Sequence, residues 1–386
     1  MSLKVLWVIY GSLDQLSGGY LYDRRVVGHL RIRGVEVELL GLNALPYLLC
    51  PLHSLHPGLR SALSPRPPAE KWDAVVIDEL THPSVFLLAA ARTRALRRRT
   101  AAVPRTPLIT LVHHLRCRED PARLDRALAR WMERCLLADS EALIVNSHTT
   151  AQSVEELLAR TKGTATIAVC PPGCDQLAVG AAAPTGSGPR PASAVPVRLL
   201  ATGNLIPRKG YDLLLEVLAD LSREPPREPP WELRIAGRIV DGAYYRRLQK
   251  LARGRSLQGR VAFLGELSSE SLAEEYRRAE VFVFPSRYEG YGISLAEAVR
   301  AGLPFVAFAA GAVAEVVKGR GLLVPPGDRA SFAGHLRRLI ADPSFRRQAA
   351  AVSRELAAGL PTWEDTGRLV LQAIRQAVGR KDEDCG

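Results

Sequence analysis

Two glutamates separated by seven residues could act together on one ligand. Glu289 follows an apolar run at 281–284, which predicts a strand buried on both faces, and Glu297 lies within a run of helix-forming residues. Gly290 and Gly292 allow the backbone to approach a ligand closely, and the helix start behind them offers N–H groups to an anion. Two acids beside an anion site suit a ligand that carries neutral hydroxyl groups next to a phosphate, such as a sugar nucleotide.

A basic pair precedes another predicted helix. Residues 203–210 read Gly-Asn-Leu-Ile-Pro-Arg-Lys-Gly and follow the strand predicted for 197–201. Lys209 is at the start of the helix predicted for 212–221, where the helix dipole disfavours a cation, and this favours a ligand role. Its neighbour Arg208 should point away from Lys209 if the turn is extended.

The stretch 285–297 resembles the Glu-x7-Glu signature of retaining glycosyltransferases of the large GT4 family, whose fold is GT-B. In that family the first acid binds hydroxyl groups of the transferred sugar, and the second holds the ribose of the nucleotide. The resemblance therefore implies these two roles for Glu289 and Glu297. It covers nearly the whole second half of the chain and, more loosely, the first half.

Residues 203–210 resemble the Gly-Arg-Leu-x-x-x-Lys-Gly motif of the same family. The resemblance implies that Lys209 holds the diphosphate and stabilises it as the leaving group. Asn204 stands where the family commonly has Arg, which is a departure from the pattern. Arg208 is the candidate to replace that arginine.

The first half carries further residues of the implied site. A loop with Gly18 and Gly19 follows the first predicted strand, and the family places this loop near the diphosphate and the acceptor. The family also has an active-site His directly after the strand predicted here for 108–112. His113 aligns best with it. Because adjacent residues of an extended chain face opposite ways, at most one of His113 and His114 should reach the sugar.

These motifs define one set of candidate site residues. The catalytic candidates are Glu289, Lys209 and His113, and the donor-binding candidates are Glu297, Gly290, Tyr291, Gly292, Asn204, Arg208, Gly18, Gly19 and Arg238. No Asp-x-Asp motif precedes a nucleotide site, so we expect no metal ion and no cofactor beyond the donor substrate.

Strands and helices alternate along both halves, which predicts an α/β chain with parallel sheets covered on both faces. We expect an N-terminal Rossmann-like domain at 1–178, a linker rich in Ala, Pro, Gly and Ser at 179–196, and a C-terminal Rossmann-like domain at 197–358. The resemblance implies the GT-B arrangement, in which an acceptor-side domain faces a donor domain across a cleft. It also implies that the terminal helix within 359–386 crosses back to the first domain.

Two local predictions concern an irregular segment and a helix cap. Residues 44–68 are rich in Pro, Leu and His without a clear period, and we expect an irregular segment there. The helix that contains Glu297 is predicted for 294–301, with Ser294 as its cap.

The composition is that of a globular protein with a basic surface. The 386 residues are 47% hydrophobic and 24% charged, and the formal net charge is +12. This charge suits nucleotide diphosphates, nucleic acid or anionic lipid. No RNA-binding aromatic motif or zinc-finger spacing accompanies it, so we expect no nucleic-acid partner. The six cysteines show no metal or redox spacing.

We expect no signal peptide, because Lys4 interrupts a start that reads as a strand, and no apolar run approaches the ~20 residues of a membrane span. We therefore expect a cytoplasmic protein. Peripheral membrane contact is a weaker hypothesis, because the resembling family often modifies lipid-linked acceptors. It rests on an arginine cluster that a solvated helix end would also explain. The cluster consists of Arg92, Arg94, Arg97, Arg98, Arg99 and Arg105.

The function implied by the resemblance is transfer of a sugar, with retention, from a nucleotide-diphosphate sugar to an acceptor hydroxyl. The acceptor stays open among a glycan, a lipid-linked molecule and a small molecule. One alternative is a sugar-nucleotide 2-epimerase of the same fold, which the Glu289–Glu297 spacing and the 203–210 motif disfavour. Another is a non-catalytic sugar-nucleotide-binding subunit, which Asn204 would favour if it disables catalysis.

Overall fold

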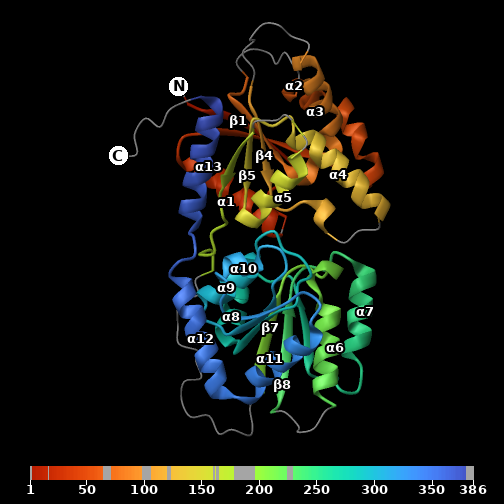
Figure 1. Ribbon diagram of the computed structural model, residues 1–386, viewed down its shortest axis with the longest axis vertical. Coiled ribbons are helices and arrows are strands. Elements are labelled where there is room, and N and C mark those ends of the chain that lie inside the picture. Colours follow the sequence, from red (N-terminus) through yellow and green to blue (C-terminus); the bar gives the residue numbers. More distant parts are fainter. Residues whose placement is uncertain are drawn as a thin grey trace. The chain divides into compact units, whose positions relative to one another are not determined.

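The computed structural model divides the chain into two compact units (Figure 1). Unit 1 comprises Met1–Pro172 with Trp363–Gly386, and unit 2 comprises Gly173–Thr362. The chain thus leaves the first unit before residue 178, and the predicted linker lies almost wholly outside the described residues. The structure describes residues 2–15, 17–63, 71–97, 106–119, 123–159, 161, 165–177, 196–223 and 229–379.

Unit 1 is built on a parallel sheet with the order β2-β1-β3-β4-β5-β6. Its strands are β1 (Lys4–Tyr10), β2 (Glu36–Leu42), β3 (Ala74–Asp78), β4 (Leu108–Val112), β5 (Ala142–Val145) and β6 (Thr166–Val169). Its helical elements are α1 (Gly18–Ile32), η1 (Tyr47–Leu55), α2 (Pro57–Ala62), η2 (Glu79–Thr81), α3 (His82–Arg97), η3 (Arg116–Arg118), α4 (Arg123–Leu137), α5 (His148–Leu158) and α13 (Trp363–Val378).

The apolar strands of unit 1 are buried on both faces, as the sequence predicts. Along β1, Val5, Trp7 and Ile9 pack against α1 and α13, while Leu6 and Val8 point to the other face and pack against α2 and α3. Figure 1 shows α1 and α13 on one side of this sheet and α2, α3 and α4 on the other. Because both faces of the sheet are covered by helices, the loops at the carboxyl ends of the strands are the expected place for a ligand site.

The last helix, α13, belongs to unit 1. Its Trp363 ring lies 5.9 Å from the ring of Tyr22, and Val370 and Ile374 are buried in the core beneath the sheet. Arg33 at the end of α1 donates to Glu364 at 2.5 Å. A chain segment nearly 200 residues beyond β6 thus completes the cover of the first sheet.

Unit 2 is built on a second parallel sheet, with the order β12-β11-β10-β7-β8-β9. Its strands are β7 (Val197–Thr202), β8 (Trp231–Ala236), β9 (Val261–Gly265), β10 (Val281–Phe284), β11 (Phe305–Phe308) and β12 (Leu322–Val324). Its helical elements are η4 (Pro207–Lys209), α6 (Tyr211–Leu221), α7 (Gly242–Ala252), α8 (Ser269–Arg278), α9 (Ile293–Arg300), α10 (Val313–Val316), α11 (Arg329–Ala341) and α12 (Pro343–Ala357).

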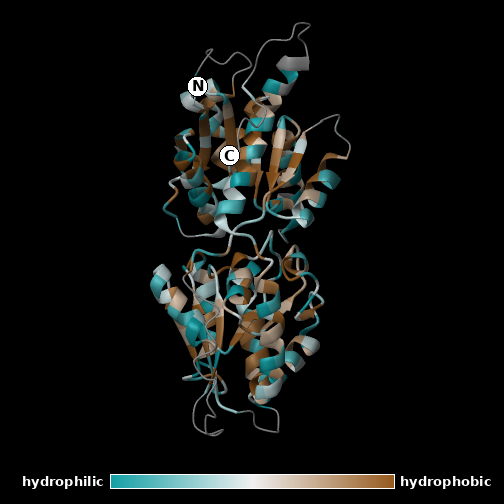
Figure 2. Ribbon diagram, turned by 90° about the vertical axis from the view of Figure 1, so that its left-hand side faces the viewer, coloured by the Kyte–Doolittle hydropathy of each residue, from teal (hydrophilic) through white to brown (hydrophobic). Residues whose placement is uncertain are grey.

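Both faces of this second sheet are also covered. Val281 and Val283 of β10 pack with α6 and α11, whereas Phe282 and Phe284 pack with α8, α9 and α12. Figure 2 shows the resulting pattern, with hydrophobic strands inside each unit and hydrophilic residues along the outer helices. The strand order reverses between β7 and β10, and such a switch point is where open α/β sheets bind ligands.

The structure differs from the sequence predictions at three places. The segment expected to be irregular contains η1 and α2, and α11 was not predicted. The cap of α9 is Gly292, at φ +102°, so Ser294 lies inside the helix and not at its cap.

Among the helices of the described ranges, none combines the length and apolar composition that crossing a bilayer requires.

Candidate active site

Two loops of unit 2 meet at the carboxyl ends of β7 and β10, which are neighbours in the sheet. The loop at 203–210 follows β7, and the loop at 285–292 follows β10. The backbone N–H of Arg287 donates to the carbonyl of Arg208 at 2.8 Å. Gly210 adopts φ +68°, and a Cβ at this position would lie 2.1 Å from the carbonyl oxygen of Pro285. Only glycine permits this approach, which brings the two motifs together.

Glu289 is the centre of the charges at this junction. Lys209 Nζ lies 2.6 Å from Glu289 Oε1, and Arg208 Nη1 lies 3.3 Å from Oε2. Arg208 also donates to the carbonyl of Tyr288 at 2.8 Å. The prediction that Arg208 points away from Lys209 is therefore wrong. The turn is the 3₁₀ segment η4, in which successive side chains are about 120° apart, so both can reach one carboxylate.

The electrostatics of the Glu289 cluster follow from burial and pairing. Burial would raise the pKa of Glu289, but the charges of Lys209 and Arg208 and the bond from Lys209 lower it to about 2. Burial lowers the pKa of Lys209, and the contact with Glu289 opposes that effect. Glu289 is thus ionised at neutral pH, and the hydrogen bond from Lys209 is charge-assisted.

Glu297 lies on α9 within a network of its own. Tyr276 on α8 donates to Glu297 Oε2 at 2.7 Å, and Gln176 Nε2 donates to Oε1. Tyr276 also shares a hydrogen bond of 2.9 Å with Thr202 at the end of β7. Burial raises the pKa of Glu297 to about 7, although these hydrogen bonds and the charge of Lys209 act in the other direction.

Tyr276 and Gln176 were not among the predicted site residues. Tyr276 stands on the apolar side of α8, where a buried tyrosine needs a partner for its hydroxyl, and this was the available signal. Gln176 follows the Pro-Pro-Gly turn at 171–173, and no pattern in the sequence links it to Glu297.

The other predicted residues of unit 2 surround this cluster. Gly290, Tyr291 and Gly292 are buried in the loop that leads into α9. Asn204 is half-buried after β7, and Leu205 N donates to the carbonyl of Arg238 at 2.9 Å, so the segments after β7 and β8 are adjacent. The Arg238 side chain itself is exposed.

The predicted residues of unit 1 also gather at the carboxyl ends of strands. Gly18 and Gly19 begin α1 after the β1 loop, and His113 follows β4. A Cβ on Gly19 would lie 3.2 Å from the His113 ring, so the small residue lets helix and ring approach each other. His114 turns the other way and contacts Glu119 at 2.8 Å. The two histidines diverge, as the alternation along an extended chain predicts.

Two buried carboxylates that the sequence analysis missed face His113. His113 Nε2 lies 3.8 Å from Asp23 Oδ1 and 4.0 Å from Asp78 Oδ2. Burial raises the pKa of Asp23 to about 7, and burial together with the charge of Asp23 raises that of Asp78 to about 8. Burial lowers the pKa of His113, and Asp78 opposes this. Near neutral pH these carboxyl groups share protons, and the imidazole is neutral.

Asp23 had a signal in the sequence that was not used. It stands on the same helical face as Val26, Val27 and Leu30, and an acid on a buried apolar stripe is unusual. Asp78 ends the apolar strand β3, at the edge where α/β sheets bind ligands.

Comparison with known proteins decides the family of the second unit. Residues 194–355 match the family model "Glycosyl transferases group 1". This range contains the complete 203–210 and 285–297 motifs. We refer to residues 194–355 as the group 1 domain, after the family model that they match.

Two of the curated proteins that the chain resembles are sugar transferases by name. The chain is 34% identical over 230 residues to D-inositol 3-phosphate glycosyltransferase of Kineococcus radiotolerans, a match that covers 55% of the chain and 52% of that protein. The chain thus spans about half the length of this relative. It is 27% identical to MMP α-(1→4)-mannosyltransferase of Mycolicibacterium hassiacum over 98% of the chain and 99% of that protein.

A solved structure with the same fold is sucrose-phosphate synthase from Thermosynechococcus elongatus. The TM-score is 0.75 at 21% identity, over 98% of this chain and 99% of that one. The likeness confirms the predicted GT-B fold class, with two Rossmann-like units on parallel sheets. That the two sheets face one another across a cleft stays a prediction.

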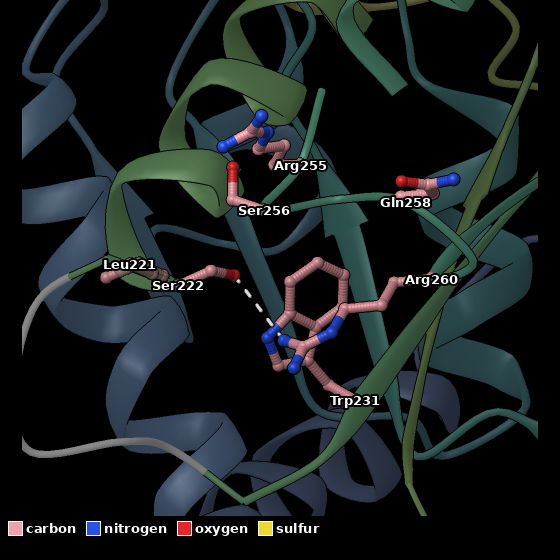
Figure 3. A pocket seen from close by; sticks show the side chains of 7 residues that line it. All are labelled: Leu221, Ser222, Trp231, Arg255, Ser256, Gln258 and Arg260. Carbon is pink, nitrogen blue, oxygen red and sulfur yellow. Dashed lines mark hydrogen bonds between the residues drawn. The ribbon is translucent and has the colours of Figure 1, made fainter. Parts of the chain in front are cut away.

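A cavity of about 410 Å³ lies elsewhere in the group 1 domain (Figure 3). It is lined by Leu221, Ser222, Trp231, Arg255, Ser256, Gln258 and Arg260. Arg260 lies over the Trp231 ring at 5.2 Å and donates to Ser222 at 3.5 Å. Because Trp231 begins β8, the cavity is at the amino-terminal edge of the sheet, opposite to the glycine-rich loops. The cavity is therefore separate from the candidate site at the loops.

Two clusters in the described part of unit 1 have ligand types that could hold a metal ion. One consists of Asp23, Asp78 and His113, and the other of Glu79, His82 and Glu133. In each, one ligand atom per residue lies within 4.8 Å of the others. In the second cluster, Glu133 already accepts hydrogen bonds from the backbone N–H groups of Arg116 and Cys117, and these bonds account for the position of its carboxylate.

Proposed function

We propose that this chain is a retaining GT4-type glycosyltransferase, which moves a sugar from a nucleotide-diphosphate sugar to an acceptor hydroxyl. The observation that carries the proposal is the convergence of Lys209, Arg208 and Glu289 at the carboxyl ends of β7 and β10. This convergence lies inside the group 1 domain and at the switch point of its sheet. It brings two cations for a diphosphate next to an acid for sugar hydroxyls.

In the proposed site each residue has one role. Lys209 and Arg208 bind the diphosphate, and the cap of α9 at Gly292 offers N–H groups to the same anion. Glu289 accepts hydrogen bonds from the sugar hydroxyls, and Glu297 accepts them from the ribose. Asn204 and Arg238 border the donor after β7 and β8. The roles that the resemblance implies for His113, Gly18 and Gly19 of unit 1 stay predictions.

The proposed reaction is a front-side substitution at the anomeric carbon. The bond between that carbon and the phosphate oxygen breaks, and the acceptor oxygen bonds to the same face of the sugar. The departing phosphate takes the acceptor proton, so no protein nucleophile is required. Catalysis then consists of positioning the two substrates and stabilising the charge that develops on the diphosphate, which Lys209 does directly.

We propose that the reaction needs no metal ion and no cofactor. Lys209, Arg208 and backbone N–H groups supply the positive charge that a metal would bring to a diphosphate.

The test begins with a thermal-shift screen of nucleoside diphosphates and their sugars. A ligand at 100 times its Kd should add about 2.7 kcal/mol to the free energy of unfolding. The donor found is then incubated with hydroxyl acceptors, among them D-inositol 3-phosphate and sugar phosphates. NMR of the product should show the anomeric configuration of the donor.

Three results would count against the proposal. An inverted product excludes the retaining mechanism. Turnover of the donor without any acceptor, to a sugar nucleotide epimeric at C2, supports the epimerase. Donor binding without hydrolysis or transfer, by the wild type and the Glu289→Gln variant alike, supports a non-catalytic binding subunit.

A further inference from the structure

The 3₁₀ helix η1 has its apolar residues on the outside. A 3₁₀ helix has three residues per turn, so every third side chain falls on one side. Tyr47, Cys50 and His53 form the inner row, and Cys50 and His53 are buried. The outer row is Leu49, Leu52 and Leu55, whose exposed fractions are 49%, 57% and 68%. This is the reverse of an ordinary surface helix, which buries its leucines.

The polar inner row fixes this orientation. The hydroxyl of Tyr47 lies 2.9 Å from His82 Nε2, and His53 Nδ1 lies 2.9 Å from the hydroxyl of Ser84, both on α3. Arg116 stacks on the outer face of the Tyr47 ring at 4.2 Å. Turning the leucines inward would break these contacts and bury unpaired polar groups, so the leucines are held toward solvent.

We name the exposed surface the leucine ridge. It consists of Leu45, Leu48, Leu49, Leu52 and Leu55. No Lys, Arg, Asp or Glu occurs between Asn43 and Leu59, so the ridge has no charged residue within its own segment. Contiguous exposed apolar patches of a few hundred Å² mark interaction sites on soluble proteins.

The surface beside the leucine ridge is aromatic and basic. α3 carries Phe86, which packs edge-on against Trp131 of α4 with ring centroids 5.0 Å apart, and Trp131 is 52% exposed. Arg130, on the same helix as Trp131, is exposed, and so is Arg126, whose Nε donates to the carbonyl of Cys117 at 3.0 Å. Figure 1 shows α3 and α4 side by side, on the face of unit 1 away from α1 and α13.

We propose that the leucine ridge docks on an anionic lipid bilayer. The leucines would enter the boundary between head groups and acyl chains, Trp131 would lie at the interface, and Arg126 and Arg130 would contact lipid phosphates. A second copy of this chain fits less well, because a two-fold contact would bring the arginines of both copies together. The inference does not depend on the proposed function.

The structure describes the arginine cluster named from the sequence only in part: Arg94 is exposed, and the side chain of Arg97 is outside the described ones. Arg92 of that cluster is 3% exposed and bonded to Glu141 at 3.1 Å, so it cannot reach lipid. Arg98, Arg99 and Arg105 lie outside the described residues.

Vesicle co-sedimentation of the full chain tests the inference at low salt. The vesicles are phosphatidylcholine alone or phosphatidylcholine mixed with phosphatidylglycerol. We expect binding that increases with the anionic lipid and falls as salt is added. Leu52→Ser/Leu55→Ser should lower the partition coefficient roughly tenfold or more, since two half-exposed leucines lose their transfer into lipid. Arg130→Glu should weaken binding to the anionic vesicles only.

Ile32→Ser is the matched control, because Ile32 is 85% exposed at the end of α1 in the same unit. It should bind vesicles like wild type, and thermal melts should show that all variants are folded. Absence of sedimentation at low salt overturns the inference, as does equal binding by wild type and the Leu52→Ser/Leu55→Ser variant. Light scattering that shows a dimer, converted to a monomer by the same double substitution, assigns the ridge to self-association and also overturns it.

Discussion

The substitution Lys209→Met tests the reasoning about the active site most directly. It removes the ammonium group 2.6 Å from Glu289 while keeping a side chain of similar length. Glu289 is buried, with 6% of its surface exposed, and it retains only Arg208 at 3.3 Å as a cation. Removing one partner of a buried ion pair costs roughly 3–5 kcal/mol. We expect about 3 kcal/mol, the lower end, because Arg208 remains.

Urea denaturation of wild type, Lys209→Met and Lys209→Met/Glu289→Gln measures this cost. If the loss comes from an unpaired carboxylate, the double variant should be more stable than the single one, since its amide carries no charge to bury. The pH dependence gives a second signature. Pairing lowers the pKa of Glu289 from 4.5 to about 2. In the wild type the ion pair therefore adds its full stability above pH 4.5, and this stability is lost as the pH falls toward 2. The free energy of unfolding of Lys209→Met should fall less over that pH interval.

The same variant separates stability from chemistry. A preorganised donor to a developing oxyanion contributes roughly 100-fold to 1000-fold to turnover. Folded Lys209→Met should therefore lose at least that factor in kcat, with a smaller change in the KM for the acceptor. Near-normal kcat in the folded variant would mean that Lys209 does not stabilise the departing diphosphate, and that Arg208 or Arg238 does so without it. Equal stability of the single and double variants would refute the account of the ion pair.

Four further outcomes are expected. Glu297→Ala should weaken binding of the nucleoside diphosphate by roughly tenfold to hundredfold, because a charge-assisted hydrogen bond is worth roughly 1.5–3 kcal/mol, and unchanged affinity in calorimetry contradicts its role at the ribose. Turnover should survive EDTA; its loss on chelation and rescue by Mg²⁺ or Mn²⁺ would refute metal independence. Asp23→Asn should flatten the pH dependence of stability. The raised pKa values of Asp23 and Asp78, about 7 and about 8 against 3.8, mean that wild type loses stability as the pH rises from 3.8 to about 8. If the melting temperatures of wild type and Asp23→Asn change equally with pH, this account is excluded. Asn204→Arg should keep activity and tighten diphosphate binding, since a guanidinium suits phosphate geometry, and steady-state kinetics that show a loss would argue that Asn204 has a role of its own.

The strands were the most predictable part of the fold. Those at 108–112 and 281–284 were predicted to the residue, because short apolar runs of strand-forming residues bounded by turns have few alternatives in an α/β chain. The segment 44–68 was not predictable in the same way. Its helix η1 buries His53 and exposes leucines, and a periodicity argument assumes the opposite.

The candidate site was predictable where one motif contains all of its parts. Glu289, Gly292 and Glu297 lie on a single strand–turn–helix segment, so their proximity follows from local structure. The contact between Gln176 and Glu297 joins residues that are 121 positions apart, and that between Arg208 and Glu289 spans 81 positions. Such contacts depend on the order of strands in the sheet, which no single segment encodes.

The acids of unit 1 show a further limit of reading roles from motifs. The resemblance pointed to His113 alone, and a lone histidine would keep a pKa near its ordinary value. The structure surrounds it with Asp23 and Asp78, neither paired with a cation among the described residues, so burial dominates and the three groups titrate together. The pKa of Glu289 is lowered at similar burial, because the charges of Lys209 and Arg208 lie next to its carboxylate. Burial alone thus does not decide the charge of an acid in this chain. The deciding factor is whether a cation from another loop arrives, which depends on the tertiary structure.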